Sequence, residues 1–239
     1  NIDRMGLDLL GTQNQLVQKI HETGVPTIVV LVGGRPLSVN WIAQNVQALV
    51  QAWEPGSLGG RALANILAGK VNPSAKLPIS IPRHSGQIQM IYNHKPSQYF
   101  HKYIDGPSTP LYPFGFGLSY TRFAYSSLKL SHTRISDKDS FTASIELTNV
   151  GDREGTEVVQ LYIRDIYSSA TRPVKELKDF ARVTLKPGEK KTVTFTVTPD
   201  KLAYWNRNMQ YGVEKGEFEI MIGSSSQDKD LKKVKMEVL

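Results

Sequence analysis

The chain has 239 residues, enough for one large domain or two of ordinary size, and 40% of them are hydrophobic, so we expect a buried core rather than disorder. It contains no cysteine, which excludes disulfides, thiolate metal sites and cysteine nucleophiles. The net charge of +7 comes from scattered Lys and Arg without a basic stripe, and no apolar run is long enough to cross a bilayer, so we expect neither a nucleic-acid partner nor a membrane span.

Helix and strand signals alternate in the first half of the chain. Apolar residues at helical spacing follow Gly11-Thr12, and Gly24 with Pro26 ends that helix. The β-branched run at 27–32 predicts a strand buried on both faces, and the segment 33–36 breaks it. Further along, we expect a helix at 38–45, a strand at 48–53, a helix at 61–68 and a strand at 77–81. Because three strands are too few for a complete open sheet, this pattern predicts the second half of an α/β/α sandwich.

The second half of the chain has a periodicity close to two from about residue 128 onward. We expect strands at 141–147, 157–163, 180–185, 192–197 and 217–222. Strong turn signals such as Lys186-Pro187-Gly188-Glu189 separate them. The fold class is therefore α/β plus all-β, with an immunoglobulin-like or fibronectin type III-like β-sandwich in second place. We predict domains at 1–104 and 126–239, joined by a connecting strap at 105–125.

The candidate chemistry in the α/β part lies where the predicted strands end. Glu54 follows the strand at 48–53, and ligands of open α/β sheets bind beyond the carboxyl ends of the strands. One carboxylate without a partner is not an acid/base mechanism, so a solvated turn residue is the favoured interpretation. Arg35 follows Gly33-Gly34 at the other strand end, where it would bind a ligand or, as we favour, pair with a neighbouring acid and hold the loop.

Aromatic and histidine side chains give weaker signals. An aromatic ring stacks well on a sugar face, although interdomain packing is favoured for each of the five candidates. These candidates are Trp41, Tyr92, Tyr99, Tyr103 and Tyr112. His94 and His101 lack metal-ligand spacing, so we expect no metal site and no cofactor. The missing glycine fingerprint argues against a nucleotide-binding protein.

A series of motifs follows in order along nearly the whole chain. They are Gly34–Leu37, Ala52–Gly56 with Gly59-Gly60, Val71–Pro78 with Pro82-Arg83, Tyr92–Pro96, Pro110–Phe123, Asn149–Gly151, Val158–Tyr162 and Arg172–Leu177. Together they resemble the C-terminal α/β domain, the strap and the fibronectin type III-like domain of family 3 glycoside hydrolases. The segment Tyr92–Pro96 is typical of the bacterial periplasmic β-glucosidases of that family.

The resemblance implies a retaining glycosidase whose Asp nucleophile comes from an N-terminal barrel and whose Glu acid/base comes from the α/β sandwich, with the two carboxylates about 5 Å apart. That Glu is expected a few residues before the position that matches Arg4, at or just before Asn1. No Glu occurs among residues 1–21. We therefore expect a C-terminal portion that contains no catalytic residue, is inactive alone, and comes from a periplasmic or secreted parent whose barrel and signal peptide lie upstream.

The same resemblance predicts binding residues and partners. Asp3 and Arg4 are expected at the substrate-binding rim of the cleft, and the loop 167–173 is a second candidate that would reach toward it. The expected partners are a β-glucoside or oligosaccharide, the barrel, and a second copy bound through an exposed sheet edge. The alternative is a non-catalytic carbohydrate-binding or scaffolding module. It predicts exposed aromatics clustered on one sheet face, whereas the period-two spacing makes most of Tyr162, Tyr167, Tyr204 and Trp205 core or corner residues.

Overall fold

The computed structural model describes residues 4–87, 90–96 and 103–239. The chain forms two compact units, and segments of the chain alternate between them. The described parts of the first unit are 4–71, 79–87, 90 and 103–112, and those of the second unit are 72–78, 91–96 and 113–239. The domain boundaries that the sequence predicts, at 104 and 125, stay a prediction. In the described part of the chain, no helix combines the length and apolar character needed to cross a membrane.

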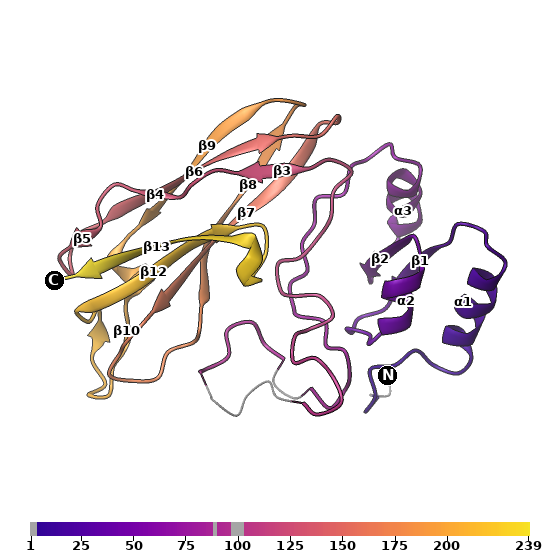
Figure 1. The fold of residues 1–239 in the computed structure, drawn as a ribbon, viewed down its shortest axis with the longest axis horizontal. Coiled ribbons are helices and arrows are strands. Elements are labelled where there is room, and N and C mark those ends of the chain that lie inside the picture. The colour runs from indigo at the N-terminus through magenta and orange to yellow at the C-terminus, as the bar shows by residue number, and fades with distance from the viewer. Residues whose placement is uncertain (1–3, 88–89, 97–102) are drawn as a thin grey trace. The chain divides into compact units, whose positions relative to one another are not determined.

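The first unit is a small α/β structure (Figure 1). Its elements are α1 (Gln13–Glu22), β1 (Ile28–Val32), α2 (Asn40–Asn45), β2 (Ala48–Trp53) and α3 (Gly59–Leu67). Strands β1 and β2 are parallel, and the crossover connection that a parallel pair needs contains α2. Leu31, Val39 and Ile42 are buried between the sheet and α2, with Val17 of α1 packed against them. The helices and first two strands that the sequence predicts are therefore confirmed.

The third strand expected at 77–81 is wrong. Ile81 forms only an isolated bridge with Tyr112, and Leu77 donates its backbone N–H to Phe116 O (2.8 Å) within the second unit. Pro78 and Pro82 explain the failure, because neither has an N–H to donate to a sheet ladder.

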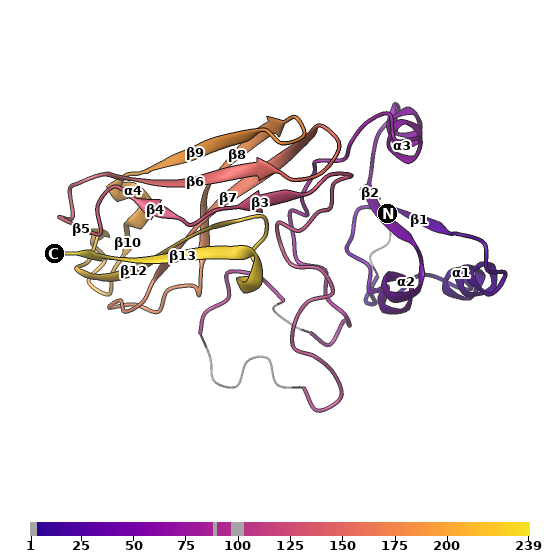
Figure 2. The ribbon, with the colours of Figure 1, turned by 45° about the horizontal axis from the view of Figure 1, so that its top comes forward.

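The second unit is a β-sandwich with two main sheets. Strands β6 and β9 belong to one sheet and β12 and β13 to the other, and the two pairs are separated in Figure 2. The five-stranded sheet has the order β5-β13-β12-β7-β8, and in the other sheet β6 pairs with β3, β4 and β9. The larger strands are β6 (Phe141–Asn149), β7 (Gly155–Asp165), β8 (Glu176–Leu185), β9 (Lys190–Val197), β12 (Gly216–Gly223) and β13 (Leu231–Val238). The smaller elements are β3 (Phe123–Tyr125), β4 (Lys129–Leu130), β5 (Arg134–Ile135), α4 (Pro199–Leu202), β10 (Tyr204–Trp205), β11 (Tyr211–Gly212) and the 3₁₀ turn Asp228–Asp230. All five strands that the alternation predicts are present.

The middle strands β7 and β12 are buried on both faces. Their inner face joins the sandwich core, and their outer face carries Tyr162 and Met221, which pack under Tyr92 and Phe114. Tyr92 is stacked on Phe114 with ring centroids 4.1 Å apart. Segments from the predicted strap and from the region before it therefore cover the sheet of the second unit.

A glycine makes this close cover feasible. Gly115 has a φ of +78°, and a Cβ at this position would lie 2.1 Å from Gln160 Oε1. Gln160 Nε2 donates to Gly115 O (3.1 Å) and to Ser224 O (2.7 Å), while Tyr162 Oη donates to Gln160 Oε1 (2.5 Å). The segment around Gly115 is thus fixed on the sheet by a buried polar network.

Candidate functional site

The carboxyl ends of β1 and β2 bring two loops together in the first unit. Gly33 N donates to Trp53 O (3.0 Å), and a register shift after Leu31 pairs Val32 with Trp53. The loop that begins at Gly33 and the turn that begins at Glu54 therefore start side by side. This is the edge of a parallel sheet at which ligands bind.

Trp53 has a left-handed backbone conformation, with φ of +53°. This conformation is rare for a bulky residue and costs about 1–3 kcal/mol, so the surrounding structure must stabilise it. The turn brings the Glu54 carboxylate against Gly34, where an added Cβ would lie 3.0 Å from Glu54 Oε1. The sequence singled out Glu54 and the glycine pair, but not this contact. A glycine pair after one strand and a carboxylate after its neighbour is the signal that would have revealed it.

Arg35 holds the beginning of the described chain. Its Nη1 donates to Arg4 O (3.2 Å), Arg4 Nη2 donates to Asp8 O (2.6 Å), and Ser38 N donates to Leu7 O (2.9 Å). The predicted loop-holding role is therefore present, but Arg35 donates to a backbone carbonyl where the sequence predicts an acid. Of the two predicted rim residues, Arg4 lies next to the loop after β1, and Asp3 lies outside the described residues.

The other candidates from the sequence separate into packed and exposed side chains. Trp41 meets His21 edge-on at 5.4 Å, and the Tyr92 hydroxyl accepts a hydrogen bond from Leu177 N (3.2 Å), so both serve packing. Tyr103 is exposed. Tyr99 and His101 lie outside the described residues. Within 4–87, 90–96 and 103–239, no group of three His, Cys, Asp or Glu residues is placed to hold a metal ion.

The loop 167–173 of the sandwich is anchored around Arg172. The Arg172 guanidinium lies 4.4 Å from the Tyr204 ring centroid, donates to Glu176 Oε2 (2.5 Å), and lies 4.0 Å from Asp165 Oδ2. Ser169 and Tyr204 both donate to the Glu214 carboxylate. A cavity of about 160 Å³ beside Asp165 and Arg172 is small compared with ordinary ligand pockets, which begin at about 300 Å³. The cluster therefore holds the loop in place, and no local sequence pattern indicates it.

Burial raises the pKa of Asp165 from 3.8 to about 6, although the Arg172 charge opposes this shift. Between these pH values the folded protein retains a proton that the unfolded chain has lost. Asp165 therefore contributes stability that is fully present below pH 4 and is lost as the pH rises through 6. We expect Asp165→Asn to remove this dependence, so the variant gains stability relative to the parent between pH 4 and pH 7. Urea unfolding at both pH values measures the difference, and a difference that does not change with pH would contradict it.

Comparison with known proteins gives a consistent result. Residues 1–120 match the glycosyl hydrolase family 3 C-terminal domain, and residues 157–226 match the fibronectin type III-like domain. A β-xylosidase of Formosa agariphila is 47% identical over 99% of this chain, and a periplasmic β-glucosidase of Salmonella typhimurium is 43% identical over 93%. A β-glucosidase structure from Erythrobacter marinus covers 100% of the chain at 43% identity, with a TM-score of 0.95.

The matches cover only part of these relatives. The chain spans 33% of the Formosa protein, 30% of the Salmonella protein and 31% of the Erythrobacter chain. A β-glucosidase from Listeria innocua, solved in complex with glucose, is covered to 34%, with a TM-score of 0.91 and 36% identity. The chain therefore corresponds to about a third of each relative.

Proposed function

Because the chain belongs to glycosyl hydrolase family 3, we propose that it is the C-terminal portion of a retaining β-glucosidase that hydrolyses O-glycosyl bonds at the non-reducing end of β-glucosides. The observation that carries the proposal is the similarity over nearly the whole chain to relatives named β-glucosidase and β-xylosidase. The chain alone is expected to be inactive, with the Asp nucleophile and the Glu acid/base in the part of the parent protein that precedes it.

The chemistry of the described residues supports this division. A retaining glycosidase needs two carboxyl groups about 5 Å apart, one as nucleophile and one as acid/base. At the strand ends of the first unit, the Glu54 carboxylate lies against Gly34 of the loop after β1. This arrangement supports a wall of the cleft rather than its reacting groups.

Turnover of an aryl β-glucoside tests the proposal. The full-length parent protein is expected to release the aryl group with retention of configuration, and the 239-residue chain is expected to release none under the same conditions. Turnover by the chain alone would show that it holds both carboxylates. An aryl β-xyloside belongs in the same assay, because the Formosa relative is named a β-xylosidase.

Arg4 and Asp3 are proposed to shape the substrate-binding rim. We expect Arg4→Ala in the full-length parent to lower kcat/KM roughly tenfold, because the loss of one hydrogen bond from a charged group is worth about 1.5 kcal/mol or more. Arg61→Ala, at an exposed position of α3, is the matched control and should leave kcat/KM unchanged. Equal kcat/KM values for the two variants would contradict a role of Arg4 at the substrate-binding rim.

Location and assembly follow from the same proposal. The 43% identity to a periplasmic β-glucosidase supports a periplasmic or secreted parent. In the first unit, β1 and β2 form a two-stranded sheet, and Ile28 and Val32 of β1 are exposed. Because such an edge pairs readily with another chain, we expect the isolated chain to self-associate, whereas the parent's barrel is its proposed partner. A single monomeric species in light scattering would contradict the self-association.

A further inference from the structure

An exposed aromatic pair projects from the hairpin of β10 and β11, which lies beside the beginning of β12 in Figure 1. Trp205 and Tyr211 are directly opposite each other, with ring centroids 5.4 Å apart and planes inclined by 52°. Their exposed fractions are 61% and 56%, and Met209 at the turn is 75% exposed. Two neighbouring large aromatic rings are therefore exposed to solvent, and exposed apolar surface of this kind often marks a binding site.

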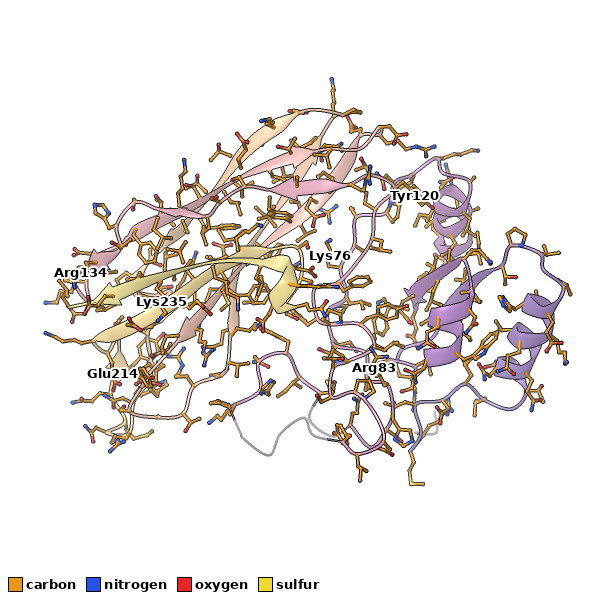
Figure 3. The ribbon with its side chains drawn as sticks, viewed as in Figure 1. Lys76, Arg83, Tyr120, Arg134, Glu214 and Lys235 are labelled. Atoms are coloured by element: carbon orange, nitrogen blue, oxygen red, sulfur yellow. The ribbon has the colours of Figure 1, made fainter. Side chains whose placement is uncertain are left out.

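The hairpin has a rigid base. Tyr204, the neighbour of Trp205, points inward and donates its hydroxyl to Glu214, whose position is labelled in Figure 3. Arg207 donates twice to Ser169 O (3.1 and 2.9 Å), so the hairpin is tied to the anchored loop 167–173. Because the hairpin is anchored before any ligand arrives, little backbone conformational entropy remains to be lost on binding.

The turn adds uncharged polar groups to the aromatic pair. Asn206 Oδ1 accepts hydrogen bonds from Asn208 N (2.9 Å) and Gln210 N (3.0 Å), and the side-chain amides of Asn208 and Gln210 are exposed at this turn. An amide both donates and accepts, as sugar hydroxyl groups require. The Arg207 guanidinium donates to Ser169 O at the base of the hairpin, and its charge interacts with the Glu214 carboxylate.

The size of the patch distinguishes a sugar from a protein partner. A stable protein interface buries about 800 Å² on each partner around a well-packed centre. The large hydrophobic side chains exposed on the hairpin are Trp205, Met209 and Tyr211, which are too few for such a centre. A pyranose ring needs only one aromatic face for its C–H groups and a few hydrogen-bonding groups at its edge.

We propose that Trp205 and Tyr211 form a binding platform for a neutral β-linked glucan chain, with uncharged polar groups of the hairpin turn contacting its hydroxyl groups. The choice of a glucan rests on the proposed function, because a parent enzyme that hydrolyses β-glucosides meets such chains. The platform assigns to the β-sandwich a role in holding the carbohydrate.

Affinity electrophoresis of the full-length parent protein, through gels that contain soluble mixed-linkage β-glucan, tests the platform. The parent protein should be retarded, and Trp205→Ala and Tyr211→Ala should each weaken the binding at least fivefold. Trp205→Phe should retain most of it, because a ring remains. Phe180→Ala on β8 removes another exposed aromatic ring and is the matched control, which should bind like the parent. Circular dichroism confirms that each variant is folded.

Equal retardation of the parent and Trp205→Ala, or no retardation of the parent, would overturn the platform. A change of molecular mass in light scattering for Trp205→Ala, without a change in retardation, would also overturn the platform, because the aromatic pair would then be a contact between subunits. Aryl β-glucoside turnover by the same parent preparation separates the two proposals. Retardation that depends on Trp205 without turnover supports the platform and contradicts the proposed β-glucosidase function. Turnover without such retardation supports the proposed function and contradicts the platform.

Discussion

Lys76→Met is expected to lower the free energy of unfolding of the second unit by about 3–5 kcal/mol, because it leaves the buried Glu157 carboxylate without its partner. Lys76 Nζ lies 2.8 Å from Glu157 Oε1, and the two side chains are 12% and 7% exposed. Lys76 Nζ also donates to Gly117 O (2.9 Å). The lysine, labelled in Figure 3, thus joins the segment 72–78 to β7 and to the strap within this unit.

The loss should depend on pH. Burial raises the pKa of Glu157, and the Lys76 charge opposes that shift. Without Lys76 the pKa rises further, so the folded variant keeps a proton on Glu157 to higher pH than the unfolded chain does. A raised folded-state pKa contributes stability that is lost as the pH increases, so the defect of Lys76→Met should grow from pH 5 to pH 8.

Denaturant unfolding of the variants measures this effect against two controls. Lys190→Met removes an exposed ion pair, in which Lys190 Nζ lies 3.5 Å from Glu146 Oε1, and should cost less than about 1 kcal/mol. The double variant Lys76→Met/Glu157→Leu removes both buried charges and should recover most of the loss. Equal losses for Lys76→Met and Lys190→Met would contradict the buried-pair interpretation.

Asn149→Ala is expected to cost roughly 3–5 kcal/mol, because it leaves several buried polar groups without partners. The Asn149 side chain is fully buried at the end of β6. Its Oδ1 accepts from Thr121 Oγ1 (2.7 Å) and Gly151 N (3.1 Å), and its Nδ2 donates to Arg153 O (2.7 Å) and Leu185 O (2.9 Å). One amide therefore connects the strap, the turn after β6 and the end of β8.

Thermal and denaturant unfolding of Asn149→Ala measure the loss. Asn208→Ala changes an exposed asparagine in the hairpin turn and should stay within about 0.5 kcal/mol of the parent chain. Asn149→Asp is a stricter variant, since its second oxygen would face the carbonyls of Arg153 and Leu185 instead of donating to them. Asn149→Ala as stable as Asn208→Ala would show that the four hydrogen bonds contribute little.

The strands of the sandwich could be predicted from the sequence where one face of the strand is exposed to solvent. In β6 and β9 buried and exposed residues alternate, and this produces the period of two. The strand β13 was missed because Lys232, Lys233 and Lys235 give it the appearance of a charged tail, although Met236 and Val238 are buried. Lys235 pairs with Glu217 on the neighbouring β12 at 3.1 Å. A lysine-rich strand can be recognised only when the acidic residues opposite it on the neighbouring strand are known.

The positions of the candidate-site residues could be predicted from the sequence, but the contacts that they make could not. Glu54 and Arg35 were placed correctly after β2 and β1, because ligand-binding loops follow the carboxyl ends of parallel strands. The left-handed backbone of Trp53 and the contact of Glu54 with Gly34 depend on the pairing of the two strands, which no local pattern encodes. The bond from Arg35 to Arg4 O also joins residues 31 positions apart.

Trapping the glycosyl-enzyme intermediate with a fluorinated β-glucoside tests most directly whether the nucleophile lies outside this chain. Retaining enzymes form a covalent bond between the sugar and a carboxylate, which a slow substrate preserves for peptide mapping. In the full-length parent protein, we predict a glucosyl label on an aspartate that precedes Asn1 and no label on residues 1–239. A label on any Asp or Glu of these 239 residues would contradict the account.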